Sequence, residues 1–270
     1  MNRTRIALVS LLAVGLLAAA AQATSLGSVK LRYYNASPRQ AGQAWLDGSY
    51  LGVLYTGMSN LQLDPSYDPD RNGTPGAGEG ELLYGMAEDN GWYLGGYCVD
   101  VRQYAVTNYR VYDVLLPAEA PVGGSNPLGG MGQQAATDLA KLFASKESLV
   151  TDKNTAAAFQ AAVWEIATET SGKYDVTSGA CRMQEKWGSG WLSLANSWLS
   201  GLQLQTEPFI GLRALASEDA QDFAIVIAGT SFTGEDEQVI PEPVTVLGVL
   251  GGLAGLGAYW KKRRSAAQAA

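Results

Sequence analysis

Two short segments of the chain carry side chains that could react with one another. One is Cys98 within Tyr-Cys-Val-Asp (97–100), in a stretch with the pattern of a strand, and the other is Gln160 within 159–166, in a stretch with helical spacing. Gln160 shares a helix face with Val163 and Trp164, so we expect its amide to be at least partly buried and to have a specific partner, since an unpaired buried amide costs about 1–3 kcal/mol. A thiol that attacks a glutamine carboxamide releases ammonia and leaves a thioester, an activated acyl group that needs no cofactor.

Together these segments resemble the thioester-forming domains of bacterial surface adhesins. Cys98 matches the family's cysteine in an aromatic-Cys-apolar-polar segment, and Gln160 matches its glutamine in Gln-x-Ala-apolar-Trp. The resemblance spans roughly 29–232. It implies a Cys98–Gln160 thioester that captures nucleophiles on a surface, polysaccharide or protein target whose identity the sequence does not give. Tyr97, Phe159 and Trp164 could shield such a bond from water.

A second interpretation of the cysteines is open at this point. The chain has two, Cys98 and Cys181, and two cysteines in an oxidising compartment usually form one disulfide. With that disulfide, the protein would be a non-covalent structural or carbohydrate-binding matrix protein. The seven Trp and thirteen Tyr could then supply a sugar-binding platform, although Trp164, Trp191 and Trp198 occupy apolar helix faces that are typical of a core.

Composition narrows the classes of function. Histidine is absent, which removes Ser-His-Asp and Cys-His catalysis and the ordinary His-based zinc sites. No pair of carboxylates stands out for glycoside hydrolysis. The formal net charge is −7, and six of the nineteen Lys and Arg lie at the two ends, so the body is more acidic still and unsuited to binding nucleic acid. We therefore expect no enzyme, no cofactor and no resident metal.

The C-terminal segment resembles the PEP-CTERM sorting signal. Pro241, Glu242 and Pro243 precede an uncharged run, 244–260, and then four basic residues. Seventeen residues approach the lower limit of about 17–25 for a membrane-spanning helix, and the basic cluster would stay in the cytoplasm. The resemblance implies that an exosortase-type transpeptidase recognises the tripeptide and processes the tail, and that the protein goes to the cell surface or into an exopolysaccharide matrix.

The N-terminus predicts the same route. Two arginines precede the apolar stretch 6–21, and small residues follow, as in a signal peptide. We expect a signal peptide at 1–23, an exported body at 24–239 and the sorting signal at 240–264. The membrane helix at 244–260 would anchor the chain in the inner membrane, at least transiently.

The body is expected to be α+β, a β-sandwich or barrel with an inserted helical subdomain at about 131–206. Strand patterns occur at 28–34, 43–55, 91–102, 108–116, 209–215 and 223–228. We expect a hairpin turn at Asp47-Gly48 within 43–55, and pairing between 91–102 and 108–116. Helical patterns cover 133–148, 154–170 and 191–204, with Asn154 as the expected N-cap of the second.

The stretch from 64 to 81 is expected to be a loop rich in Pro, Gly and acidic residues. Asp68, Asp70, Asn72 and Glu79 within it fit the spacing of a calcium-binding loop. Pro75 occupies the usual apolar position of that loop, and a solvated turn-rich insertion is the alternative interpretation.

Overall fold

The computed structural model describes residues 23–121, 130–169, 171–186, 188–204 and 211–227. The chain divides into two units, 1–231 and 232–270, and all of the described residues belong to the first. The predicted signal peptide, except for Ala23, and the whole predicted sorting signal lie outside the described residues. Within those residues, every helix is too short or too polar to cross a bilayer.

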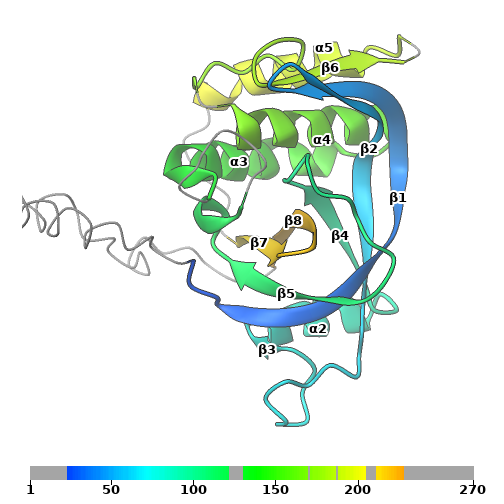
Figure 1. Cartoon of the computed structure of the whole chain (residues 1–270), viewed down its shortest axis with the longest axis vertical. Coiled ribbons are helices and arrows are strands. Elements are labelled where there is room, and N and C mark those ends of the chain that lie inside the picture. Colours follow the sequence, from blue (N-terminus) through cyan, green and yellow to red (C-terminus); the bar gives the residue numbers. More distant parts are fainter. Residues whose placement is uncertain (1–22, 122–129, 170, 187, 205–210, 228–270) are drawn as a thin grey trace, which may run out of the picture. The chain divides into compact units, whose positions relative to one another are not determined.

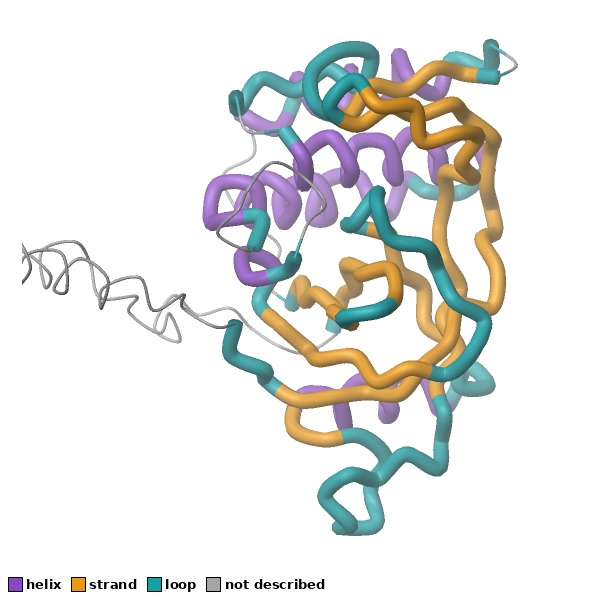
Figure 2. Tube along the Cα trace, viewed as in Figure 1, coloured by secondary structure: helices purple, strands orange, loops and turns teal. Residues whose placement is uncertain are grey.

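The first unit is a mixed α/β structure built around a large antiparallel sheet (Figures 1 and 2). Each strand of the order β2-β4-β8-β7-β5-β1 pairs with the next, and β1 also pairs with β2, so the pairings return to the first strand. The short strand β3 pairs with the start of β1, and β6 pairs with its end. The strands are β1 (Gly27–Leu46), β2 (Ser49–Leu63), β3 (Ala77–Gly78), β4 (Tyr93–Cys98), β5 (Arg110–Leu115), β6 (Cys181–Glu185), β7 (Leu212–Ser217) and β8 (Ala220–Val226).

The hairpin of β1 and β2 is the longest pairing, and its predicted turn is confirmed. Asp47 and Gly48 connect the strands with φ of 50° and 78°, and two successive positive φ values give a turn whose twist matches the strands. The strand patterns at 28–34 and 43–46 belong to one continuous strand, because β1 runs unbroken from Gly27 to Leu46.

The predicted pairing of 91–102 with 108–116 is wrong. β4 pairs with β2 and β8, whereas β5 pairs with β1 and β7. The segment between β4 and β5 instead bonds to other parts of the sheet, since the Val99 amide donates to the Asp222 carbonyl and the Tyr33 amide donates to the Val106 carbonyl. Two strands close in sequence are therefore separated in the sheet by β8 and β7.

The described residues between β5 and β7 include three α-helices, although these two strands are neighbours in the sheet. They are α3 (Gly132–Lys146), α4 (Lys153–Thr168) and α5 (Trp191–Ser200). Figure 1 shows them grouped over one end of the strands. The stretch also contains β6, which the sequence did not predict, and short 3-10 turns lie at Pro117–Glu119, Glu147–Leu149 and Leu202–Leu204.

Helix α4 is the centre of this group. Every residue from 156 to 168 is buried, as expected of a helix that is apolar on all sides, and the helix packs against α3, α5, β1 and β2. The predicted N-cap, Asn154, is wrong, because the helix begins at Lys153 and its N-cap is Asp152. The Asp152 carboxylate accepts hydrogen bonds from the Asn154 and Thr155 amides, and the Thr155 hydroxyl accepts one from the Asp152 amide.

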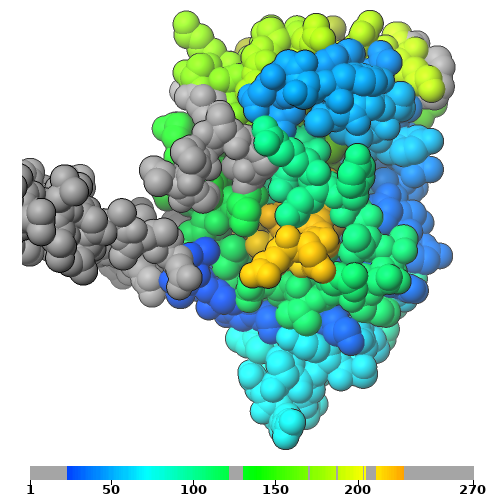
Figure 3. Space-filling model, in the orientation of Figure 1, coloured from blue at the N-terminus to red at the C-terminus, as the bar shows by residue number. Residues whose placement is uncertain are grey.

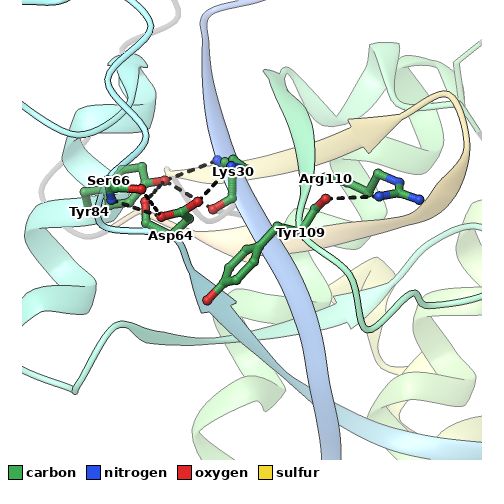
Figure 4. Close-up of polar contacts among 6 residues, drawn as sticks. All are labelled: Lys30, Asp64, Ser66, Tyr84, Tyr109 and Arg110. Atoms are coloured by element: carbon green, nitrogen blue, oxygen red, sulfur yellow. Dashed lines mark hydrogen bonds and ion pairs between the residues drawn. The ribbon is translucent and has the colours of Figure 1, made fainter.

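Helix α2 (Glu79–Glu88) begins inside the stretch expected to be a loop. Glu79 and Glu81 lie in its first turn, where negative charge favours a helix. A polar cluster joins this region to β1 (Figure 4). The Lys30 ammonium lies 2.8 Å from the Asp64 carboxylate, and the Tyr84 hydroxyl donates to the carbonyl of Asp64 at 2.9 Å. These contacts fix the end of β2 against β1.

Candidate functional site

Cys98 and Gln160, 62 residues apart, are in direct contact. Cys98 ends β4, and Gln160 lies in the middle of α4. The backbone amide of Cys98 donates to Gln160 Oε1 at 2.9 Å, and Gln160 Nε2 donates to the Cys98 carbonyl at 2.8 Å. The prediction that Gln160 has a specific buried partner is confirmed, since its side chain is 1% exposed and bonds through both polar atoms.

The Cys98 thiol is buried in the core beside one polar side chain of the sheet. Its Sγ lies 3.5 Å from the hydroxyl of Ser59, a buried residue of β2. Burial raises the pKa of the Cys98 thiol to about 12, because a thiolate is poorly solvated there. The sulfur is therefore a neutral thiol at physiological pH, and any attack by it must deliver its proton nearby.

The two hydrogen bonds fix the orientation of the Gln160 carboxamide against the backbone of Cys98. The Cys98 N–H points at the Gln160 oxygen, where negative charge develops when a nucleophile adds to the carbonyl carbon. The Gln160 nitrogen, which would leave, is held at the Cys98 carbonyl. The arrangement thus supplies an oxyanion donor, a fixed leaving group and a thiol on the same residue as the donor.

Aromatic rings pack beside this contact. The Tyr97 and Phe159 ring centroids are 4.5 Å apart, Phe143 lies 4.9 Å from Phe159, and Trp198 lies 6.3 Å from it. The three residues expected to exclude water, Tyr97, Phe159 and Trp164, are all buried. Tyr97 and Phe159 directly adjoin Cys98 and Gln160 in the chain, so this cluster lies next to the contact between β4 and α4.

A pocket of about 270 Å³ reaches this aromatic cluster from outside. Tyr97 and Phe143 form part of its lining, together with Met58 and Glu147. The same two rings also contact Phe159. Cys98, Phe159 and Gln160 do not line the pocket, so it reaches only the outer rings of the cluster.

The alternative Cys98–Cys181 disulfide is not present, since both cysteines are free and buried. Cys181 begins β6 opposite Leu46 of β1, and its thiol interacts with the side chain of Thr168. Burial raises the pKa of the Cys181 thiol to about 12. The two thiols thus have different partners, Ser59 for Cys98 and Thr168 for Cys181.

Sequence reasoning missed two buried acids. Desolvation raises the pKa of both Glu165 and Asp222 to about 8. Glu165 accepts a hydrogen bond from the Asp175 amide at 2.7 Å, and Asp222 accepts one from the Ser217 amide at 2.8 Å. Glu165 carried a signal, because it is a lone acid in an apolar helical stretch. No feature of the sequence pointed to Asp222, or to Ser59, the residue beside the Cys98 thiol.

The candidate calcium loop is organised by other contacts. The Asp68 carboxylate accepts hydrogen bonds from the Asn72 and Gly73 amides. Both oxygens of Glu79 are bound by the Arg213 guanidinium, at 2.6 and 2.9 Å. Within the described part of the chain, no three Cys, Asp or Glu side chains form a group that could hold a metal ion. These contacts favour the turn-rich insertion.

Comparison of the chain with protein-family models, curated proteins and solved structures finds no match. The functional conclusion therefore rests on the geometry around Cys98 and Gln160. Pro241, Glu242 and Pro243 of the expected sorting motif lie outside the described residues.

Proposed function

We propose that this chain is an exported surface or extracellular-matrix protein that captures its partner covalently through a Cys98–Gln160 thioester. The observation that carries the proposal is the reciprocal hydrogen bonding of the Gln160 carboxamide to the backbone of Cys98. A buried glutamine needs partners, but it does not need them on a residue that also carries a nucleophile. Here one cysteine supplies the thiol, the oxyanion donor and the acceptor for the leaving nitrogen.

Formation of the thioester balances without any co-reactant. A bond forms between Cys98 Sγ and the Gln160 carbonyl carbon, and the bond from that carbon to Nε2 breaks. The thiol proton goes to the departing nitrogen, which leaves as ammonia. Ser59, whose hydroxyl lies 3.5 Å from the sulfur, would orient the thiol and take part in this proton transfer.

Capture of a partner uses the stored acyl group. An amine or hydroxyl of the partner attacks the Gln160 carbonyl carbon, the bond to sulfur breaks, and the proton of the nucleophile goes to Cys98. The product is an amide or ester between Gln160 and the partner. Because the glutamine nitrogen is not regained, each molecule reacts once, and the protein is an adhesin and not an enzyme.

The finer architecture belongs to the same proposal. From the pairings that return from β1 to β2, we infer a closed barrel with the helical segment 131–206 inserted between β5 and β7. The insertion supplies Gln160 and the barrel supplies Cys98, so the bond would join the two parts. Export by the signal peptide, membrane anchoring through 244–260 and processing by an exosortase-type enzyme would place the reactive group outside the cell, where partner nucleophiles occur.

Methylamine labelling of the full-length chain tests the proposal. Peptide mapping should find methylamine attached at residue 160 in the wild-type protein and in Cys181→Ala, whose buried thiol is the matched control. Cys98→Ala should incorporate none. Phe143→Ala should be labelled faster, because its ring separates the pocket from Phe159. Label that is absent from residue 160, or that persists in Cys98→Ala, would refute the thioester.

A further inference from the structure

The sheet formed by β6, β1 and β2 has one face covered by the protein and one open face. On the covered side, Leu46 and Met183 are buried, and Gly42 lies against the indole of Trp191, which a Cβ at that position would approach to 3.0 Å. The open face carries large side chains, since Tyr50 is 52% exposed and Tyr55 is 59% exposed. Figure 3 shows the end of the β1–β2 hairpin, in blue, at the surface beside the yellow-green segments of the insertion.

The strand register places the side chains of the open face in rows. Trp45 lies opposite Arg182 on one side and Tyr50 on the other. In the next row, Gln43 lies opposite Gln184 and Val53, and it donates a hydrogen bond to the Tyr50 hydroxyl at 3.1 Å. We call this surface the hairpin face and define it by six residues: Arg39, Gln43, Trp45, Tyr50, Tyr55 and Arg182.

Two arginines of the hairpin face lie over its aromatic rings. The Arg182 guanidinium is 4.2 Å from the centroid of Trp45, and the Arg39 guanidinium is 4.1 Å from that of Tyr55. Among the described residues, neither arginine forms an ion pair with an acid. Stacking holds the guanidinium plane but leaves N–H groups at its edge to donate. The face therefore offers cationic donors beside exposed rings in an otherwise acidic protein.

We propose that the hairpin face binds an acidic polysaccharide of the uronic-acid class. The exposed rings would pack against the C–H faces of the sugar rings, and Arg39 and Arg182 would donate to the uronate carboxylates, which match a guanidinium in geometry. Gln43 supplies an amide for sugar hydroxyls. A bulge in β2 puts Tyr50 and Tyr55 opposite Trp45 and Ala41, which lie four residues apart on β1. The two tyrosines are therefore about 13 Å apart along the strand, so the array suits an extended chain better than a compact ligand.

The charge complementarity decides between classes of ligand. A neutral glucan would use the rings and leave both arginines without a counter-ion. The proposal is independent of the thioester, because none of the six residues takes part in the contact between Cys98 and Gln160.

Affinity electrophoresis of the full-length chain tests the proposal with two polymers, polygalacturonate and neutral dextran. We expect retardation in gels that contain polygalacturonate and none in dextran, with retardation weakened by added salt. Trp45→Ala and Arg182→Gln should each raise the dissociation constant at least about tenfold. Tyr104→Ala is the matched control, since Tyr104 is 77% exposed and lies between β4 and β5.

Three results would overturn the proposal: no retardation by polygalacturonate, equal retardation by dextran, or full retention of binding by both Trp45→Ala and Arg182→Gln. Loss of binding in Tyr104→Ala would count against it as well. Thermal unfolding of each variant identifies any that fails to fold. Should Trp45→Ala fail in this way, Arg182→Gln decides alone, because Arg182 is an exposed side chain.

Discussion

The reciprocal bonds between Gln160 and Cys98 predict a large and specific loss of stability when the carboxamide is removed. The change is Gln160→Met, which keeps the length of the side chain and deletes both polar atoms. It is made in a Cys98→Ala background, which cannot form a thioester but retains the backbone N–H and carbonyl that Gln160 contacts at 2.9 and 2.8 Å. The comparison therefore isolates the hydrogen bonds from any covalent link.

The expected magnitude follows from the number of groups left unpaired. Each buried polar group without a partner costs about 1–3 kcal/mol, so two cost about 2–6 kcal/mol of unfolding free energy. Urea unfolding of the double variant and of Cys98→Ala measures this difference. The matched control is Gln133→Met in the same background, because Gln133 is an exposed residue of α3 and its replacement should change stability by no more than about 0.5 kcal/mol.

A loss no larger for Gln160→Met than for Gln133→Met would refute the reasoning. It would mean that the backbone of residue 98 finds other partners, or that Gln160 does not hold this position in the folded chain.

Four further predictions concern the same region. First, the thioester would close a loop of 62 residues. Opening the thioester with methylamine should therefore lower the unfolding free energy by about 4 kcal/mol, on the chain-entropy estimate used for cross-links. An unchanged urea midpoint would contradict the link. Second, Ser59→Ala should slow ammonia release during thioester formation by up to about tenfold, the worth of one hydrogen bond; an unchanged rate would exclude a role for Ser59. Third, thiol titration in urea without amine should detect only Cys181, and both cysteines after methylamine; two thiols at the outset would count against the thioester. Fourth, burial raises the pKa of Glu165 from 4.5 to about 8. The contribution of Glu165 to the unfolding free energy should therefore be complete below about pH 4.5 and lost as the pH rises through about 8. Urea unfolding of Glu165→Gln should show a flatter decline with pH, and an unaltered pH slope would show that Glu165 does not cause the decline.

Local signals in the sequence predicted the parts of the structure that depend on few residues. The Asp47-Gly48 pair predicted the hairpin turn, because both residue types tolerate the positive φ that the turn requires. Apolar residues at helical spacing predicted the three inserted helices. That Gln160 has a buried partner was predictable as well, because a lone amide on an apolar helix face must bond to something specific.

Features that depend on distant contacts were not predictable in the same way. The neighbours of β4 in the sheet are set by β8, more than 120 residues later in the chain, and no local pattern encodes that choice. Helix α2 was hidden by composition, since the acids that suggested a loop lie in its first turn. Glu79 fitted a calcium-loop spacing, yet its carboxylate binds Arg213. Ser59 became visible only when the fold placed it beside the Cys98 sulfur.

The most direct test of the thioester is the intact mass of the purified, amine-free protein. The thioester predicts a mass lower by one ammonia than that of the processed sequence, and this deficit should disappear in Cys98→Ala and persist in Cys181→Ala. A full mass with no deficit would contradict the central claim. So would a deficit of only two hydrogens that a reductant reverses, because it would show a disulfide between the two cysteines.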